Sequence, residues 1–286
     1  MIWLGTLVQG LMLGGLYALF AAGLSLVFGI MRLVNLAHGD LIVLAAYLIL
    51  GIGTVTGLNP FAAALLAMPL MFALGWVLQT ALLDRVLGED ILPPLLVTFG
   101  LSVVIQNGLL QAFTADSRKL PVGPIEAHSV ALGPVTVGVM PLLTFASAVL
   151  VILALNRLFY RTALGRAFRA TSDDAVTAQL MGIEPRRVFA MATGIALVVS
   201  TIAALYLGAR ANFDPSIGPA RLLYAFEAVI IGGLGSLWGT LAGGIVIGVA
   251  QAFGAAVNPE WQNPRRPHRL RPHPSREAAR PLPARE

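Results

Sequence analysis

Six polar side chains interrupt long apolar segments of the chain and are its first candidates for chemistry. A polar group at membrane depth costs free energy, so such residues mark candidate pathways for solutes, ions or protons. Each also has a structural interpretation, as a hydrogen-bonded interfacial turn, as a hydrogen bond between helices or as a residue at the membrane surface. They form three sets: Asn35, His38 and Asp40; Gln106 and Asn107; and Glu227.

Motifs for catalysis and nucleotide binding are missing from the sequence. There is no cysteine, which excludes thiol nucleophiles and cysteine metal ligands. The single lysine, Lys119, precedes Leu120 rather than Ser or Thr, which excludes an ATP-binding loop. Gly233 and Gly235 open a dinucleotide-like pattern, but Trp238 occupies the third glycine position. We therefore predict a chain that is not an enzyme and that holds no metal or cofactor.

Composition predicts a membrane protein. The 286 residues are 57% hydrophobic and 12% charged, about half the 25% of a soluble domain. A spanning helix needs roughly 20 apolar residues, and 41–83 is long enough for two. This predicts an all-α, polytopic transmembrane bundle of about eight helices, whose last part is broken near 232–236. The charge-free segments are 2–31, 41–83, 91–115, 127–156, 188–209 and 228–259.

The distribution of arginine predicts the orientation of the bundle. Arg32, the first basic residue, follows the first apolar segment, which puts the N-terminus outside by the positive-inside rule. After five helices the chain is inside again, where six arginines gather. The segments 116–138 and 210–221 then lie outside. The six are Arg157, Arg161, Arg166, Arg169, Arg186 and Arg187.

The inner loop contains a short amphipathic helix by its pattern. The segment 172–174 offers Ser and Asp side chains that can cap a helix start. Val176, Leu180 and Ile183 recur at helical spacing, and Gly182 can end the helix. This apolar stripe either packs on its own membrane domain or docks onto a partner.

Glycines recur four residues apart in the first and last apolar segments. Small residues at this spacing let helices approach closely in lipid. We predict helix packing by these glycines, with a helix break beside a pathway as the alternative. They are Gly10 and Gly14, and then Gly235, Gly239 and Gly243.

The segment 263–286 differs from the rest of the chain. It holds seven Arg and six Pro in 24 residues without apolar periodicity, which predicts disorder. It also carries the whole net charge of +5, because its two Glu leave a balance of +5 and the 12 basic and 12 acidic residues of 1–262 cancel. The basic isoelectric point is therefore no sign of nucleic-acid binding.

Three blocks resemble the permease subunits of bacterial ABC importers for branched-chain amino acids. The segment 10–47 contains the core Asn-Leu-Ala-His-Gly; the others are 160–183 and 226–248. The pattern is closer to the first of the two permeases in such systems, and urea-importer permeases share much of it. The resemblance implies a permease domain over 1–262, in the bacterial inner membrane with the N-terminus in the periplasm.

The resemblance also implies partners. They are a second homologous permease, a periplasmic substrate-binding protein and two ATP-binding subunits, which hold the ATP and Mg²⁺. The segment 159–187 would be the cytoplasmic coupling loop that docks into an ATPase. The residues that match the family there are Gly165, Arg166, Ala170, Asp174, Ala178 and Gly182.

The end of the chain departs from the family pattern, which has another apolar helix and a short basic terminus. The sequence from residue 263 is rich in Arg, Pro, Ala and His, a composition typical of GC-rich DNA translated out of frame. We therefore hypothesise a frameshift near codon 262. A different class of function also stays open: a channel or secondary carrier that works without an ATPase, for a small polar solute such as urea. It would use the set near His38 or Glu227 as its ion or proton site.

Overall fold

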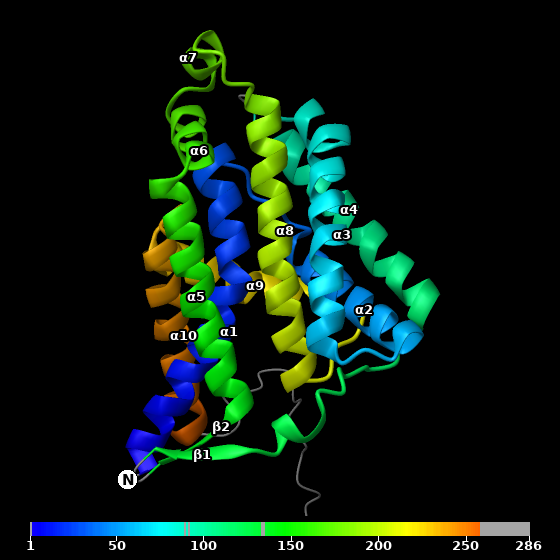
Figure 1. Cartoon of the computed structure of the whole chain (residues 1–286), viewed down its shortest axis with the longest axis vertical. Coiled ribbons are helices and arrows are strands. Elements are labelled where there is room, and N and C mark those ends of the chain that lie inside the picture. The colour runs from blue at the N-terminus through cyan, green and yellow to red at the C-terminus, as the bar shows by residue number, and fades with distance from the viewer. Residues whose placement is uncertain (1, 89, 91, 133–134, 258–286) are drawn as a thin grey trace, which may run out of the picture.

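The computed structural model describes residues 2–88, 90, 92–132 and 135–257. The tail 263–286 and its suggested frameshift origin lie outside these residues. The secondary-structure elements of the described chain are all helices, except for the two strands of one short hairpin (Figure 1). The helices are α1 (Ile2–Met31), α2 (His38–Thr56), α3 (Pro60–Ala81), η1 (Leu83–Arg85), α4 (Leu92–Phe113), η2 (Gly123–Glu126), α5 (Val139–Arg161), α6 (Ala163–Asp173), α7 (Ala175–Leu180), α8 (Pro185–Arg210), α9 (Gly218–Gly232) and α10 (Leu237–Val257); the strands are β1 (Ser129–Leu132) and β2 (Val135–Gly138).

The predicted polytopic helical bundle is confirmed. Within the described residues, seven helices are long and apolar enough to cross a membrane: α1, α2, α3 continued by η1, α4, α5, α8 and α10. The eighth apolar helix, α9, has 15 residues, about 22 Å at 1.5 Å per residue. It is shorter than the roughly 30 Å hydrocarbon core, so α9 does not span the membrane by itself.

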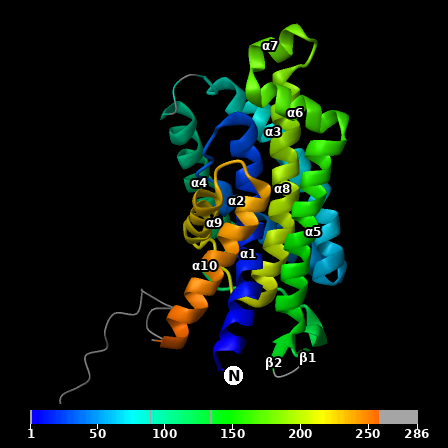
Figure 2. The ribbon, with the colours of Figure 1, turned by 90° about the vertical axis from the view of Figure 1, so that its left-hand side faces the viewer.

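Helix α1 forms the centre of the bundle. It packs against α10, α8, α5 and α9, and its second half from Leu16 to Val27 is almost entirely buried. Figure 2 shows α10 running alongside α1 on one side and α8 and α5 on the other. A helix that is apolar all round must be covered on every face, and this second half of α1 is covered by its own chain.

Helix α2 begins inside the bundle rather than at its surface. The His38 ring nitrogen Nε2 lies 2.9 Å from the carbonyl oxygen of Phe20, and Phe20 is 11 residues before the end of α1. At 1.5 Å per residue this is about 16 Å below that end. The segment after Met31 therefore returns into the bundle before α2 starts.

The two ends of the bundle differ in character. At one end lie the N-terminus and the β1–β2 hairpin, and at the other lie α6 and α7 (Figure 1). We call these the hairpin end and the α7 end. At the hairpin end, Arg118 and Phe213 exchange backbone hydrogen bonds of 2.8 and 2.9 Å, so the segments after α4 and α8 are joined there.

The predicted break in the last apolar segment is confirmed. Helix α9 ends at Gly232 and α10 begins at Leu237. Gly233 and Gly235 between them have φ values of +90° and +81°, which glycine adopts without the steric cost other residues meet. The turn reverses the chain, so α10 runs antiparallel to α1 back toward the hairpin end (Figure 2).

Candidate functional site

Helix α7 is built by a cap and a turn that its sequence specifies. The Asp174 carboxylate accepts hydrogen bonds from the backbone N–H groups of Val176 (2.9 Å) and Thr177 (3.1 Å) and from the Thr177 hydroxyl (2.5 Å). The Thr177 hydroxyl bond, followed by the two backbone bonds, lowers the pKa of Asp174 below its ordinary value. At the other end of α7, Gly182 has a φ of +84°, which a β-branched residue rarely adopts.

The predicted start of this helix is confirmed at Asp174 and wrong at the two residues before it. Ser172 and Asp173 belong to the preceding helix, α6, and only Asp174 is a cap. The Ser172 hydroxyl instead donates a 2.7 Å hydrogen bond to the carbonyl oxygen of Gly29 in α1. The segment 163–173 lies among the arginines of the inner loop, and the sequence analysis did not predict a helix there.

Two of the three residues of the predicted apolar stripe are uncovered. Val176 and Leu180 are 70% and 82% exposed, while Ile183 is half-buried against the core. Met181 beside them is 79% exposed, and Ala178 is buried. Figure 1 places α7 beyond the ends of the spanning helices. Exposed aliphatic side chains that cluster on one face are typical of an interaction site.

A tight corner joins α7's neighbour α6 to the bundle. The Thr162 hydroxyl accepts a 3.0 Å hydrogen bond from the Gly165 backbone N–H. A Cβ on Gly165 would lie 2.2 Å from the carbonyl oxygen of Leu158, so this corner admits no side chain. Of the remaining residues matched to the coupling segment, Arg166 is exposed and Ala170 is half-buried.

The first polar set lies deep inside the bundle. Asn35, His38 and Asp40 are 5%, 1% and 1% exposed. The Asn35 side chain accepts a 3.0 Å hydrogen bond from the backbone N–H of Ala37, and His38 is bonded to α1 as described above. Asn35 and His38 thus form hydrogen bonds that fix the start of α2, in agreement with their interpretation as part of a hydrogen-bonded turn.

Asp40 connects the first polar set to the second. Its Oδ2 accepts a 2.6 Å hydrogen bond from the Ser102 hydroxyl, which itself accepts one of 3.0 Å from the Gln106 amide. Its Oδ1 makes no hydrogen bond to another described residue. A buried carboxylate is therefore linked through α4 to a half-buried amide.

The starts of two helices meet at this carboxylate. A Cβ on Gly39 would lie 2.0 Å from the Gly218 carbonyl oxygen, and one on Gly218 would lie 1.9 Å from Oδ1 of Asp40. Asp40 is in the first turn of α2, and Gly218 is the first residue of α9. The positive ends of both helix dipoles thus favour negative charge at this point.

The other two predicted polar residues stand apart. Asn107 is exposed and donates its 2.8 Å hydrogen bond to the Val103 carbonyl of its own helix. Glu227 is half-buried on α9, and no hydrogen bond or ion pair joins it to another described residue. The structure therefore brings Asp40 and Gln106 together but not Asn107 or Glu227.

The spaced glycines lie at backbone contacts between helices. A Cβ on Gly14 would fall 2.5 Å from the Cα of Ile245, and one on Gly10 would fall 2.7 Å from the Cα of Val249, so α1 and α10 approach backbone to backbone. Within the α9–α10 hairpin, Gly239 and Gly243 face the backbone carbonyls of Gly232 and Ala228. Gly235 approaches Gly29 in α1, with a Cβ-to-Cα distance of 3.0 Å.

Sequence patterns missed several residues that hold these sites. Ser102 is the central partner of Asp40, and its signal was its spacing of four from Gln106 on one helix face. Gln79 is fully buried and joins α3 to α8, accepting a 2.7 Å bond from the Thr193 hydroxyl. The Tyr47 hydroxyl is buried and makes no hydrogen bond to another described residue.

Comparison with known proteins gives a consistent result. A family model described as the permease component of branched-chain amino acid transport systems matches residues 6–264. The permease protein BraD of a high-affinity branched-chain amino acid transport system in Pseudomonas aeruginosa is 30% identical over 270 residues, which cover 89% of this chain and 87% of BraD.

Two enterobacterial relatives carry the same description. The LivH permease protein of Salmonella typhimurium is 31% identical over 274 residues, which cover 89% of this chain and 86% of that protein. The LivH protein of Escherichia coli K12 is 28% identical over 268 residues, with the same coverage. No solved structure matches the chain significantly.

Proposed function

Because the chain belongs to the family of permease components of branched-chain amino acid transport systems, we propose that it imports branched-chain amino acids across a bacterial inner membrane as one subunit of an ATP-driven importer. The observation that carries this proposal is the family match over residues 6–264, combined with seven helices able to span a membrane. The transport itself is conformational, and the chain does not act as an enzyme.

In this proposal, ATP hydrolysis by partner subunits at the α7 end supplies the energy for transport. Two ATP-binding subunits hold ATP and Mg²⁺, and the apolar stripe of α7 inserts into one of them. The support is local: Val176, Leu180 and Met181 are uncovered, while the Asp174 cap and the Gly182 turn keep α7 folded beyond the bundle. The coupling loop is then 159–187, and its arginines support a cytoplasmic location for this end.

The opposite end faces the periplasm in this proposal, together with the N-terminus. A periplasmic substrate-binding protein delivers the amino acid to the hairpin end, where the segment between α4 and α5 carries β1, β2 and η2. A second, homologous permease completes the pathway across the membrane. The permease domain is the part of the chain within 1–262.

Reconstitution tests this function directly. The chain is co-expressed with candidate ATPase, second-permease and binding-protein genes, and the purified complex is placed in proteoliposomes. We expect co-purification of the ATPase and uptake of labelled leucine that requires ATP and the binding protein. Urea serves as the competing cargo, because resemblance to urea-importer permeases was also expected from the sequence.

Two outcomes would contradict the proposal. Uptake of urea without uptake of leucine would assign the chain to another cargo. Uptake by the chain alone, without an ATPase, would make it a secondary carrier, with Asp40 or Glu227 as the first ion sites to test.

A matched pair of variants tests the docking step. Leu180→Asp puts a charge on the exposed stripe of α7, and we expect it to abolish co-purification of the ATPase. Gln179→Asp adds the same charge at the neighbouring exposed position and should leave the complex intact. Equal behaviour of the two variants would exclude docking through the stripe.

A further inference from the structure

A cavity opens between α2 and α4 in the half of the bundle nearer the hairpin end. Its volume is about 460 Å³, within the roughly 300–1,000 Å³ usual for small-molecule sites. Apart from Tyr47 and Thr56, each lining residue is apolar. Leu44, Leu48 and Ile52 come from α2, and Leu109 and Phe113 come from α4.

The cavity lies between polar groups at its inner and outer ends. Leu44 follows Asp40 by four residues and Leu109 follows Gln106 by three, so the hydrogen-bonded Asp40–Ser102–Gln106 set is one helical turn further inward. The apolar lining is therefore bounded by polar groups along the axes of α2 and α4.

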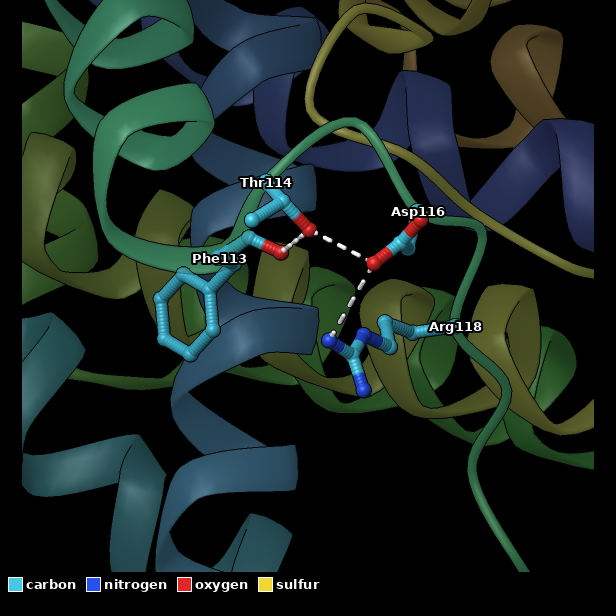
Figure 3. Close-up of polar contacts among 4 residues, drawn as sticks. All are labelled: Phe113, Thr114, Asp116 and Arg118. Atoms are coloured by element: carbon cyan, nitrogen blue, oxygen red, sulfur yellow. Dashed lines mark hydrogen bonds and ion pairs between the residues drawn. The ribbon is translucent and has the colours of Figure 1, made fainter.

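At the outer end, the cavity wall continues directly into a charged turn. Figure 3 shows the Phe113 ring on one side of this turn and the side chains of Thr114, Asp116 and Arg118 on the other. The Thr114 hydroxyl donates a 2.7 Å hydrogen bond to Asp116, and an Arg118 nitrogen lies 3.9 Å from the same carboxylate oxygen. Both charges are solvent-exposed, so each is free to exchange partners.

Tyr47 adds an unsatisfied group to the lining. Its ring packs 4.6 Å from that of Phe113 and 5.0 Å from that of Phe213, measured between centroids. Its hydroxyl is buried and makes no hydrogen bond to another described residue. A buried hydroxyl without a partner costs free energy.

We propose that this cavity binds the branched aliphatic side chain of the transported amino acid, with the Asp116–Arg118 turn and the Tyr47 hydroxyl receiving its charged head. An α-amino acid carries one cation and one anion beside its side chain, which Asp116 and Arg118 complement in turn. Urea has no apolar part, and its polar groups would face carbon in this cavity. The subsite rests on the proposed function, whose cargo it explains.

Gly51 offers a way to fill the cavity without disturbing the fold. It lines the cavity, and a Cβ built on it meets no atom within 4 Å. Gly100 on α4 also meets no atom within 4 Å, is exposed and lies outside the lining. The two glycines therefore allow the same substitution inside and outside the subsite.

The test compares Gly51→Leu with Gly100→Leu in the complete reconstituted importer. Initial uptake rates are measured for leucine, valine and alanine. We expect Gly51→Leu to lower leucine uptake relative to alanine uptake by roughly tenfold, the scale on which hydrophobic pockets discriminate side-chain size, while Gly100→Leu keeps wild-type ratios. Tyr47→Phe, which removes only the hydroxyl, should raise the KM for all three cargoes.

A photoreactive diazirine analogue of leucine gives an independent measurement. Illumination of the wild-type complex during turnover should label peptides of α2 and α4 that contain Leu44 or Leu109, and Gly51→Leu should remove this label. Labelling elsewhere, or an equal loss of all three cargoes in Gly51→Leu, overturns the subsite and indicates a surface for lipid or the second permease. A wild-type complex that takes up no leucine overturns the proposed function and the subsite together, whereas normal wild-type uptake with an unchanged Gly51→Leu ratio overturns the subsite alone.

Discussion

Gly39 and Gly218 cross backbone against backbone at the starts of α2 and α9. A Cβ on Gly39 would lie 2.0 Å from the carbonyl oxygen of Gly218, a separation that no side chain tolerates. The two helices begin inside the bundle, and this contact fixes their mutual position beside the buried carboxylate of Asp40.

Gly39→Ala should therefore destabilise the protein. The added methyl group meets backbone rather than a flexible side chain, and overpacking of this kind costs about 1–3 kcal/mol. Thermal unfolding of the purified protein in detergent measures the effect. Gly108→Ala, whose Cβ meets no atom within 4 Å, is the control; equal melting temperatures for the two variants would refute the contact.

Ser102→Ala should remove the link between Asp40 and α4. The lost hydrogen bond joins a hydroxyl to a carboxylate, a class of bond that contributes about 1.5–3 kcal/mol. Chemical unfolding followed by circular dichroism measures the loss. Asn107→Ala on the same helix, whose side chain bonds only to its own helix, should stay within about 0.5 kcal/mol of the wild type, and a similar loss there would count against the prediction.

Gly182→Val should uncouple transport while membrane insertion stays intact. The φ of +84° at this position costs a β-branched residue about 1–3 kcal/mol, enough to unwind the turn after the short helix α7. ATPase activity and leucine uptake are measured on the same proteoliposomes. Gly182→Asn, which adopts left-handed conformations more readily, should retain uptake; normal uptake by the valine variant would contradict this role for the turn.

The Asp174 cap predicts a pH dependence of α7. Hydrogen bonds from the Thr177 hydroxyl and from two backbone N–H groups lower the pKa of Asp174 in the folded state. Its stabilisation is thus present above the unfolded-state value of about 3.9 and is lost as the pH falls through the lower folded-state pKa. Native-state amide exchange at Val176 and Thr177, corrected for intrinsic rates, should show protection that declines in this window.

Two variants control the pH experiment. Asp174→Asn retains an acceptor for the cap, so its protection should not change over the same pH window. Asp174→Ala removes the acceptor and should abolish protection at every pH. A wild-type decline that Asp174→Asn shares would assign the pH effect to another group.

Glu227→Gln should lower uptake without lowering stability. Glu227 forms no hydrogen bond or ion pair with another described residue, so its neutral isostere loses no observed contact. Melting temperature and leucine uptake are measured together. Unchanged uptake would indicate that Glu227 lies at the membrane interface without a role in transport.

Hydropathy predicted the spanning segments because it reports which segments are apolar. It does not report how deep in the bundle a residue between two such segments lies. The charge-free segment 41–83 begins after Asp40, so the pattern put His38 and Asp40 at a junction near the surface. The bond from His38 to Phe20 instead places them inside. A carboxylate at that depth is possible because Ser102, two helices away, supplies a hydrogen bond, and no local window of sequence contains both residues.

The α7 end shows the same division between local and tertiary information. The Asp174 cap and the Gly182 turn are local, so side-chain chemistry and glycine position were sufficient to predict them. Helix α6 was not predicted, although the segment 163–173 contains the good helix formers Ala, Leu and Arg. Its contacts with the bundle are tertiary and lie outside any local pattern: Phe168 is fully buried, and Ser172 bonds to α1.

Ser172, Gly29 and Gly235 meet at one place, although they belong to three distant parts of the sequence. The Ser172 hydroxyl donates a hydrogen bond to the carbonyl of Gly29, and Gly29 packs backbone to backbone against Gly235. A displacement of α6 by a bound partner therefore either breaks the Ser172 bond or moves the end of α1 and the α9–α10 turn with it. The position of the α7 end of the bundle therefore depends on all three segments, and a change in any one of them alters the contacts of the other two.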